Sequence, residues 1–379
     1  MEMEPEIEVT LQHFNPFENS SLLGFVEIAS DGLRKRFTYS ANFNGEFLLL
    51  ETSKSIHLNE LLNVKKTDEE DAHELLHCST ATVTAEDEKD LTLIATVWTE
   101  INKFCIPIRC FFALFTIDSN LEVKLLKEIQ IEDENPSSQV AFSSILPFSN
   151  GSDAILKWTL YPNSRPPLVY LLNESGDIVV KQEVDEEEIE KAVDGAVIRS
   201  SSQGHWQALG FDCGIISVTR FDKHDIPLIS KSLKVSGAVS IVQLLPNNSD
   251  ERETSVLISS VIGPATIWTF RHEGDKMAAS LVATLHGSQA HDTVCCAALL
   301  NDNLMAIGTY AGKILFYRLP LQPHSTYSHI PIQSNLQIFA VYDAKLPILA
   351  MQANSPNEMT ILTNCGIHQL NISLVSDDS

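Results

Sequence analysis

The sequence contains no run of eighteen apolar residues, the length that a membrane-spanning helix needs. Its N-terminus, MEMEPEIEV, is acidic rather than basic and then apolar, so we expect no signal peptide. The chain has 379 residues, of which 44% are hydrophobic and 20% charged, a composition typical of globular proteins. We therefore expect no direct insertion into a membrane.

Basic residues are scarce in this chain. Lys and Arg total 26 against 50 Asp and Glu, which gives a formal net charge of −24 at pH 7. Such a charge repels the phosphates of nucleic acids, so we expect no nucleic-acid partner. The seven cysteines are odd in number and never spaced C-x-x-C, which is typical of free thiols in a reducing compartment such as the cytoplasm.

The common catalytic and cofactor-binding motifs are absent. The sequence has no G-x-S-x-G and no G-x-G-x-x-G. The stretch GTYAGKI has three residues instead of four between Gly308 and Gly312, and Ile314 stands where a phosphate-binding loop needs Ser or Thr. We therefore predict no catalytic residue and no cofactor.

One stretch, His73-Glu74-Leu75-Leu76-His77, has the spelling of a zinc-protease helix. On a helix, the two histidines would hold Zn²⁺ and the glutamate would take a proton from the metal-bound water. The residues that follow, CSTATVT, include four β-branched residues, which predict a strand instead of a long helix. Thr80 also stands where the longer motif has glycine. We interpret the stretch as an acidic turn leading into a strand, and reject His73, Glu74 and His77 as metal ligands.

Other metal-binding groups are weakly indicated. A third zinc ligand would have to come from one of three acidic residues, Glu86, Glu88 or Glu100, and nothing in the sequence selects among them. A second grouping has two histidines near two cysteines, His286 and His291 with Cys295 and Cys296. Histidines in a loop explain this grouping equally well, so we predict no metal site.

Five hairpin-like segments recur from residue 167 onward. In each, an apolar run leads through a turn glycine into a second apolar run, as in two antiparallel strands. The segments are residues 167–182, 206–221, 255–270, 304–319 and 359–374. Their turn glycines, Gly176, Gly214, Gly263, Gly312 and Gly366, recur every 38 to 54 residues. Residues 45–61 and 92–117 are interpreted as two further hairpins with altered turns.

A strand-rich repeat of this length matches the blade of a β-propeller. We predict an all-β fold in which residues 1–375 form a single β-propeller domain of seven antiparallel blades, followed by a short acidic tail at 376–379. Six or eight blades stay open as alternatives, because the first intervals rest on weak patterns. Residues 7–14 alternate like a strand, and we expect them to complete the last blade and close the ring.

Three tryptophans, Trp98, Trp158 and Trp268, are each followed by threonine. Because large aromatic side chains fill the spaces between packed sheets, we expect them to pack between blades rather than bind a ligand.

The C-terminal half resembles the kaptin-like proteins. The resemblance lies in the order, spacing and character of a series of segments: ALGFDCGIISVTRFD, SGAVSIVQLLP, TSVLISSVIGPATIWTF, HDTVCCAALLNDNLMAIGTYAGKILFYRL and LPILAMQANSPNEMTILTNCGIHQLNISL. It covers residues 200–375 and extends more loosely upstream through LTLIATVW and PPLVYLLNESGDIVV.

This resemblance implies a non-enzymatic propeller subunit of the KICSTOR complex, a scaffold in nutrient sensing. The implied partners are a second propeller subunit of the FG-GAP type and a very large scaffold subunit. The implied role is to restrain target-of-rapamycin (TOR) signalling at the lysosome during amino-acid and glucose starvation. Actin binding is also attached to the family, and with it a location in actin-rich cell projections.

Two departures from the family pattern bear on function. The loop containing Asp302 and the loop 354–359 carry too few oxygen ligands for the calcium-loop-like sequence that family members can have. The strong negative charge and the lack of a basic tail disfavour direct binding to actin, which is itself acidic. We therefore predict a protein-interaction subunit whose interface residues the sequence does not assign. An actin-associated cytoskeletal protein and a zinc-dependent hydrolase are the alternatives.

Overall fold

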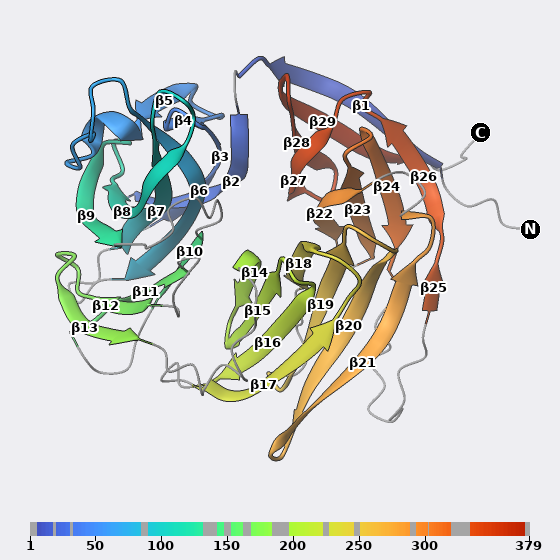
Figure 1. Ribbon diagram of the computed structural model, residues 1–379. Coiled ribbons are helices and arrows are strands. Elements are labelled where there is room, and N and C mark those ends of the chain that lie inside the picture. The colour runs from blue at the N-terminus through green and yellow to red at the C-terminus, as the bar shows by residue number, and fades with distance from the viewer. Residues whose placement is uncertain are drawn as a thin grey trace, which may run out of the picture. The chain divides into compact units, whose positions relative to one another are not determined.

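The computed structural model describes thirteen segments of the chain (Figure 1). They are residues 6–17, 20–30, 33–84, 90–131, 142–147, 153–161, 168–183, 197–222, 227–245, 251–288, 293–301, 303–319 and 334–375. These residues form seven sheets, called blades 1 to 7 below, in two compact units. The proposed tail 376–379 lies outside the described residues.

The three-blade unit comprises Leu22–Ile198 and Lys223–Ile226 and holds blades 1 to 3. Blade 1 contains β2 (Ser20–Ser30), β3 (Leu33–Asn42), β4 (Glu46–Leu49) and β5 (Lys54–His57), followed by the 3-10 helix η1 (Leu58–Leu61). Blade 2 contains β6 (Ala72–Thr84), β7 (Asp90–Ile101), β8 (Pro107–Ile117) and β9 (Val123–Ile131). Blade 3 contains β10 (Phe142–Pro147), β11 (Leu156–Tyr161), β12 (Leu168–Leu172) and β13 (Ile178–Glu183).

The four-blade unit comprises Met1–Ser21, Arg199–Asp222 and Pro227–Ser379. Blade 4 contains β14 (Val197–Gln203), β15 (Trp206–Phe211), β16 (Ile215–Phe221) and β17 (Pro227–Lys234). Blade 5 contains β18 (Val239–Leu245), β19 (Glu253–Ser260), β20 (Ala265–Glu273), β21 (Lys276–Leu285) and β25 (Ser334–Leu336). Blade 6 contains β22 (Val294–Asn301), β23 (Leu304–Thr309), β24 (Lys313–Arg318) and β26 (Ile338–Asp343). Blade 7 contains β27 (Ile348–Ser355), β28 (Glu358–Thr363), β29 (Gly366–Val375) and β1 (Glu6–Asn15).

The predicted fold class is confirmed: the chain is an all-β protein, a seven-bladed β-propeller. All seven predicted hairpins are present as the pairs β4–β5, β7–β8, β12–β13, β15–β16, β19–β20, β23–β24 and β28–β29. The five predicted turn glycines all adopt positive φ angles, between 77° and 141°. This is the backbone region that side chains with a Cβ rarely enter, so glycine marks these turns in the sequence.

The predicted N-terminal strand is also confirmed. β1 pairs antiparallel with β29, so the first strand of the chain is the fourth strand of blade 7 (Figure 1). Ile7 and Val9 of β1 pack against the apolar cluster between blades 6 and 7. One strand departs from the predicted antiparallel blades: the three-residue β25 pairs parallel with the end of β21 and gives blade 5 a fifth strand.

The hydrophobic core is divided among the spaces between neighbouring blades. Five clusters of buried side chains lie between blades 1 and 2, 2 and 3, 4 and 5, 5 and 6, and 6 and 7. In β8, Phe111 faces the cluster between blades 1 and 2, while the next residue, Phe112, faces the cluster between blades 2 and 3. Because successive side chains of a strand point to opposite faces, a central strand buried on both faces carries apolar residues in consecutive positions, as in Phe111 to Leu114.

The three tryptophans pack between blades, as expected. Trp98 lies fully buried between blades 1 and 2, and a Cβ on Gly45 in the β3–β4 turn would collide with its indole. Trp158 is fully buried between blades 2 and 3, with its ring centroid 6.5 Å from that of Phe112. Trp268 is partly buried against the cluster between blades 4 and 5.

Replacing Trp98 by alanine should lower the free energy of unfolding by about 3–5 kcal/mol, because the substitution leaves a cavity between two blades. Urea unfolding followed by circular dichroism would measure the change. Phe104→Ala, at an exposed position of the same blade, is the control and should change stability by less than about 0.5 kcal/mol. Equal effects of the two substitutions would contradict this account of the core.

Deleting residues 1–14 should lower the melting temperature by several degrees. The deletion exposes the backbone edge of β29 and removes the packing of Ile7 and Val9. Differential scanning calorimetry would measure the shift, with deletion of residues 376–379 as the control. An unchanged melting temperature would show that β1 adds nothing to blade 7.

Candidate protein-interaction surface

The stretch His73–His77 lies in strand β6 and not in a helix. His73 stacks edge-on against Phe111, with ring centroids 5.1 Å apart, on the side of blade 1. His77 pairs across the sheet with Val97, which faces blade 3. A β-bulge between the histidines produces this change of face, since it adds one residue to the alternation. The two histidines point to opposite faces of β6 and do not share a metal-binding site.

The strand was correctly predicted, but its start was not. β6 begins at Ala72 and includes the whole motif, whereas the sequence suggested a strand only after His77. The acidic turn ends at Asp71, whose carboxylate accepts a hydrogen bond of 2.8 Å from the backbone N–H of Asp68.

The remaining candidate metal ligands do not converge among the residues that the structure describes. Four of them, Glu86, Glu88, His291 and Asp302, lie outside these residues. His286 lies after β21, where its backbone N–H donates a 2.9 Å hydrogen bond to the carbonyl of Leu336. Within the described segments, no group of three or more His, Cys, Asp or Glu side chains could hold a metal ion. The same segments contain no helix long and apolar enough to cross a membrane.

Glu100, the last of the proposed zinc ligands, is the centre of a buried ionic network in blade 2. Its side chain has no solvent exposure, and its carboxylate accepts short hydrogen bonds from Arg109 Nε and from the backbone N–H of Thr67. The Nε2 atom of His73 lies 4.0 Å from the same carboxylate. Arg109 also donates to the carbonyl of Lys65. The network therefore fastens the segment 65–71 to strands β7 and β8.

Hydrogen bonds stabilise the negative charge of Glu100 in this network. Burial alone would raise the pKa of Glu100, but the hydrogen bonds from Thr67 and Arg109 outweigh it and hold the pKa below its usual value. Burial lowers the pKa of His73, although the Glu100 carboxylate opposes the shift. Glu100 is therefore ionised at neutral pH and His73 is uncharged.

Two exposed apolar side chains lie next to this network, in the turn between β7 and β8, and one of them, Phe104, is the most exposed large apolar side chain of the described residues. Phe104 is 72% exposed and Ile106 53%. The side-chain oxygen of Asn102 accepts hydrogen bonds from the backbone N–H groups of both residues, at 2.9 and 3.0 Å. Cys105 between them has a positive φ of 59°. The side chain of Asn102 thus closes the backbone of the turn, and the two apolar side chains extend from it into solvent.

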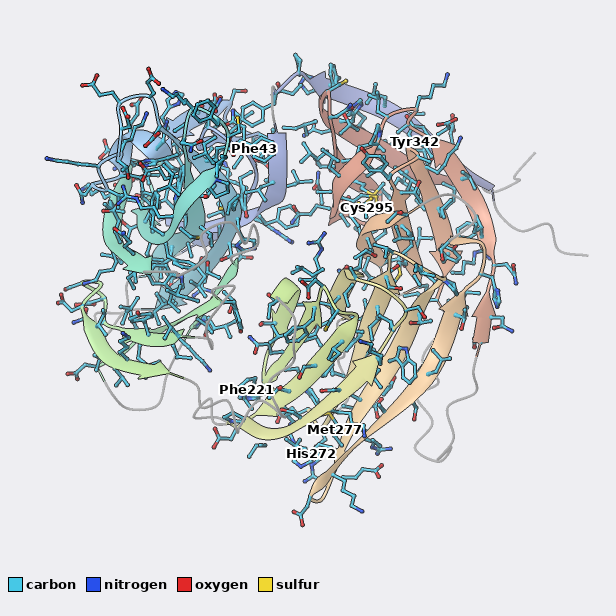
Figure 2. The ribbon with its side chains drawn as sticks, in the orientation of Figure 1. Phe43, Phe221, His272, Met277, Cys295 and Tyr342 are labelled. Atoms are coloured by element: carbon cyan, nitrogen blue, oxygen red, sulfur yellow. The ribbon has the colours of Figure 1, made fainter. Side chains whose placement is uncertain are left out.

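Blade 1 has a further exposed apolar side chain in the equivalent turn, between its second and third strands. Phe43 lies between β3 and β4 and is exposed (Figure 2). Its carbonyl accepts a 2.8 Å hydrogen bond from the N–H of Leu75 near the start of β6. At this end of β6, Ala72 pairs with Ile101, the residue before the Asn102 turn. The two apolar turns of the three-blade unit are thus joined through β6.

The four-blade unit repeats this feature in blades 5 and 6. Val261 and Ile262, in the turn between β19 and β20, and Tyr310, in the turn between β23 and β24, are all exposed, Ile262 to 62% and Tyr310 to 57%. A Cβ on Gly237, in the connection between β17 and β18, would lie 2.8 Å from Val261 Cγ2. The N–H of Tyr310 donates a 2.9 Å hydrogen bond to Thr293 in the connection leading into β22.

In both units, therefore, apolar side chains gather in the turns between the second and third strands of the blades. We call these residues the apolar turns: Phe43, Phe104, Ile106, Val261, Ile262 and Tyr310. Apolar side chains that form an exposed patch are a common mark of protein–protein interaction sites. These residues could not be predicted as surface residues, because apolar residues in a sequence are normally assigned to the core. The sequence pattern that could have indicated them is a hairpin turn with Phe or Ile where polar residues are usual, as in NKFCIP.

Comparison with known proteins supports the fold but identifies no family. No family model and no curated protein matches the chain. Among solved structures, the chain is similar to BBS1N, crystallised in complex with ARL6DN, with a TM-score of 0.54 and 9% sequence identity over 98% of each chain. It is also similar to Sqt1 from Chaetomium thermophilum, with a TM-score of 0.54 and 14% identity over 90% of this chain and 81% of the other. At such low identity the similarity establishes the fold alone.

Replacing Glu100 by glutamine should lower the free energy of unfolding at pH 7 by about 3 kcal/mol, because Arg109 loses a buried counter-charge. The folded-state pKa of Glu100 is lowered, so its ionised form contributes stability above the ordinary glutamate pKa of about 4.3. This contribution disappears as the pH falls through the folded-state value. The stability difference between wild type and variant should therefore be largest at neutral pH and shrink below about pH 4.

Urea unfolding between pH 3.5 and pH 7.5 would measure this difference. Glu70→Gln is the matched control, because Glu70 forms an exposed ion pair of 3.1 Å with Lys103 in the same blade. It should change stability by less than about 0.5 kcal/mol. A pH-independent cost of Glu100→Gln would show that the carboxylate charge is not what stabilises blade 2.

Proposed function

We propose that the chain is a non-enzymatic protein-interaction subunit of a KICSTOR-like complex, and that its apolar turns contact the partner proteins. The observation that carries this proposal is the presence of exposed phenylalanine, isoleucine and tyrosine side chains on short turns of a β-sheet scaffold. Aromatic residues at rigid, protruding positions commonly dominate the binding energy of protein interfaces.

The choice of complex rests on the resemblance to kaptin-like proteins. All five segments that carry it fall in the four-blade unit, and they include the exposed Val261, Ile262 and Tyr310. The partners would be a second propeller of the FG-GAP type and a very large scaffold subunit. In this role, residues 1–375 act as one propeller domain. The protein would be cytoplasmic, recruited to the lysosomal surface, and would restrain TOR signalling during amino-acid and glucose starvation.

The structural neighbours support the coarser part of this proposal. BBS1N was crystallised with a protein partner, ARL6DN, so a chain of this fold can serve as a binding module. The geometry of β6 counts against the alternative of a zinc hydrolase, because His73 and His77 face opposite sides of the strand.

The test is affinity purification of the tagged chain from nutrient-starved cells, followed by mass spectrometry of the co-purifying proteins. We expect near-stoichiometric recovery of a second propeller protein and a very large scaffold. Phe104→Asp with Ile106→Asp, and separately Ile262→Asp, should lower the recovery of one or both partners roughly tenfold, because an interface does not bury a carboxylate without a counter-charge.

Leu228→Asp is the matched control, because Leu228 is an exposed apolar residue on strand β17 and not in an apolar turn. It should leave recovery unchanged. If Leu228→Asp lost the partners and the turn variants kept them, the interface would lie on the strand edges and not on the apolar turns. Recovery of actin and its regulators without the two expected partners would overturn the proposal in favour of the cytoskeletal alternative.

A further inference from the structure

The sequence contains one run of three consecutive basic residues, Arg34-Lys35-Arg36, at the start of strand β3. All three residues are exposed, in a chain that has 26 basic and 50 acidic residues in total. The run lies at the opposite end of β3 from Phe43, which follows the last residue of that strand. It is therefore a charged surface feature of blade 1 that is separate from the apolar turn of the same blade.

Arg34 already has a counter-charge. Its Nε and Nη2 atoms donate hydrogen bonds of 2.8 and 2.9 Å to the two carboxylate oxygens of Asp90. Asp90 is the first residue of β7, so this ion pair joins blades 1 and 2. Neither Lys35 nor Arg36 forms an ion pair with another residue of the segments that the structure describes. These two cations are therefore the members of the run that can receive an anion from outside.

Of these two cations, Arg36 has the geometry of an anion-binding group. Its Cζ atom lies over the ring of Phe25 on β2, 3.4 Å from the ring centroid. A guanidinium stacked on an aromatic ring keeps the N–H groups at its edges available, and their planar spacing matches the two oxygens of a carboxylate. Partial burial lowers the pKa of Arg36, and the nearby carboxylate of Glu27 opposes this shift. Arginine nevertheless stays charged at neutral pH.

Blade 2 holds the part of β2 that carries the Phe25 ring. The Oγ1 atom of Thr80 donates a 2.5 Å hydrogen bond to the carbonyl of Phe25. The Oγ1 atoms of Thr82 and Thr92 each donate a 2.7 Å hydrogen bond to the carbonyl of Glu27. The ring under the guanidinium therefore belongs to a fixed piece of backbone, and a preorganised group loses less entropy when it binds.

We propose that Arg36, stacked on Phe25, is a docking site for an acidic segment of a partner protein, and that it binds one carboxylate of this segment through two parallel hydrogen bonds. The net charge of −24 favours a segment over an extended anionic surface, because a membrane or a nucleic acid would be repelled by the charge of the whole molecule. A short segment responds mainly to charges within about 8 Å, the Debye length at physiological ionic strength. The site is independent of the apolar turns and holds a different part of a partner.

The test titrates the full-length protein into a fluorescein-labelled hexaglutamate peptide and follows fluorescence anisotropy at physiological ionic strength. We expect saturable binding, and no binding of the corresponding hexaglutamine peptide. Arg36→Gln should weaken the binding roughly tenfold, because a charge-assisted bidentate contact is lost. Arg36→Lys should weaken it nearly as much, since lysine keeps the charge but not the planar pair of donors. Phe25→Leu removes the ring and should weaken it roughly threefold.

Lys35→Gln is the matched control, because it removes the same charge from the neighbouring exposed position. The Nζ atom of Lys35 lies 4.9 Å from the ring centroid of Phe37, which packs between blades 1 and 2, so Lys35 points to the other face of β3. This variant should weaken peptide binding less than about twofold. Equal losses in Lys35→Gln and Arg36→Gln, or full binding by Arg36→Lys, would show unspecific charge attraction and overturn the proposal.

Vesicles of phosphatidylcholine with and without phosphatidylserine distinguish the remaining source of anions. We expect no co-sedimentation of the protein with either kind of vesicle. Binding to the phosphatidylserine vesicles without binding to the hexaglutamate peptide would assign Arg36 to lipid headgroups and overturn the proposal. Absence of binding to both probes would also overturn it.

Discussion

The blades of this protein have apolar faces, and within each unit such a face is buried by the neighbouring blade. Phe111, Phe112, Ala113 and Leu114 are consecutive in β8, have no exposed surface, and divide between two clusters. Burial of a phenylalanine side chain contributes about 1.5–3 kcal/mol, so a blade alone would expose more apolar surface than its backbone hydrogen bonds could offset. Every cluster described here is shared by two blades. Stability is therefore a property of adjacent blades, and the apolar turns, whose side chains belong to no cluster, are free to carry other residues.

The buried Glu100 network differs from this apolar packing, and it connects the core of blade 2 to the turn that carries Phe104 and Ile106. A carboxylate with no solvent exposure would destabilise an apolar blade unless it were paired. Here its partners come from β8 and from the segment 65–71, so the blade can keep the charge only if that segment is in place. Glu100 and Arg109 lie on the two strands that flank the turn of Phe104 and Ile106. A second pair, Lys103 with Glu70, joins the turn itself to the same segment. These ionic contacts thus restrict the position of the turn that carries Phe104 and Ile106.

The hairpins could be predicted from the sequence because their turns need positive φ angles, and glycine supplies these at a regular interval. Blade 2 gave a weaker signal, since its turn is closed by the side chain of Asn102 and carries a positive φ at Cys105. The faces of β6 could not be predicted, because a bulge moves His77 away from the face of His73 and leaves no mark in the residue pattern. The three-residue β25 could not be predicted either, because its pairing partner is far away in the sequence and three residues carry no periodicity. The buried pair of Glu100 and Arg109 was equally hidden, because charged residues in a sequence are normally assigned to the surface.

Two further kinds of position could not be predicted, because the backbone geometry there does not select the side chain. The first strands of blades 5, 6 and 7 each have a β-bulge at the second residue, which is serine in blade 5, cysteine in blade 6 and leucine in blade 7. The turn between the second and third strands holds Asp212 in blade 4 but Ile262 and Tyr310 in blades 5 and 6. Packing between blades explains neither choice, because neither position contributes to a cluster. Residue identity at these positions therefore carries information that the repeat itself does not contain. The turns present large apolar side chains suited to protein partners.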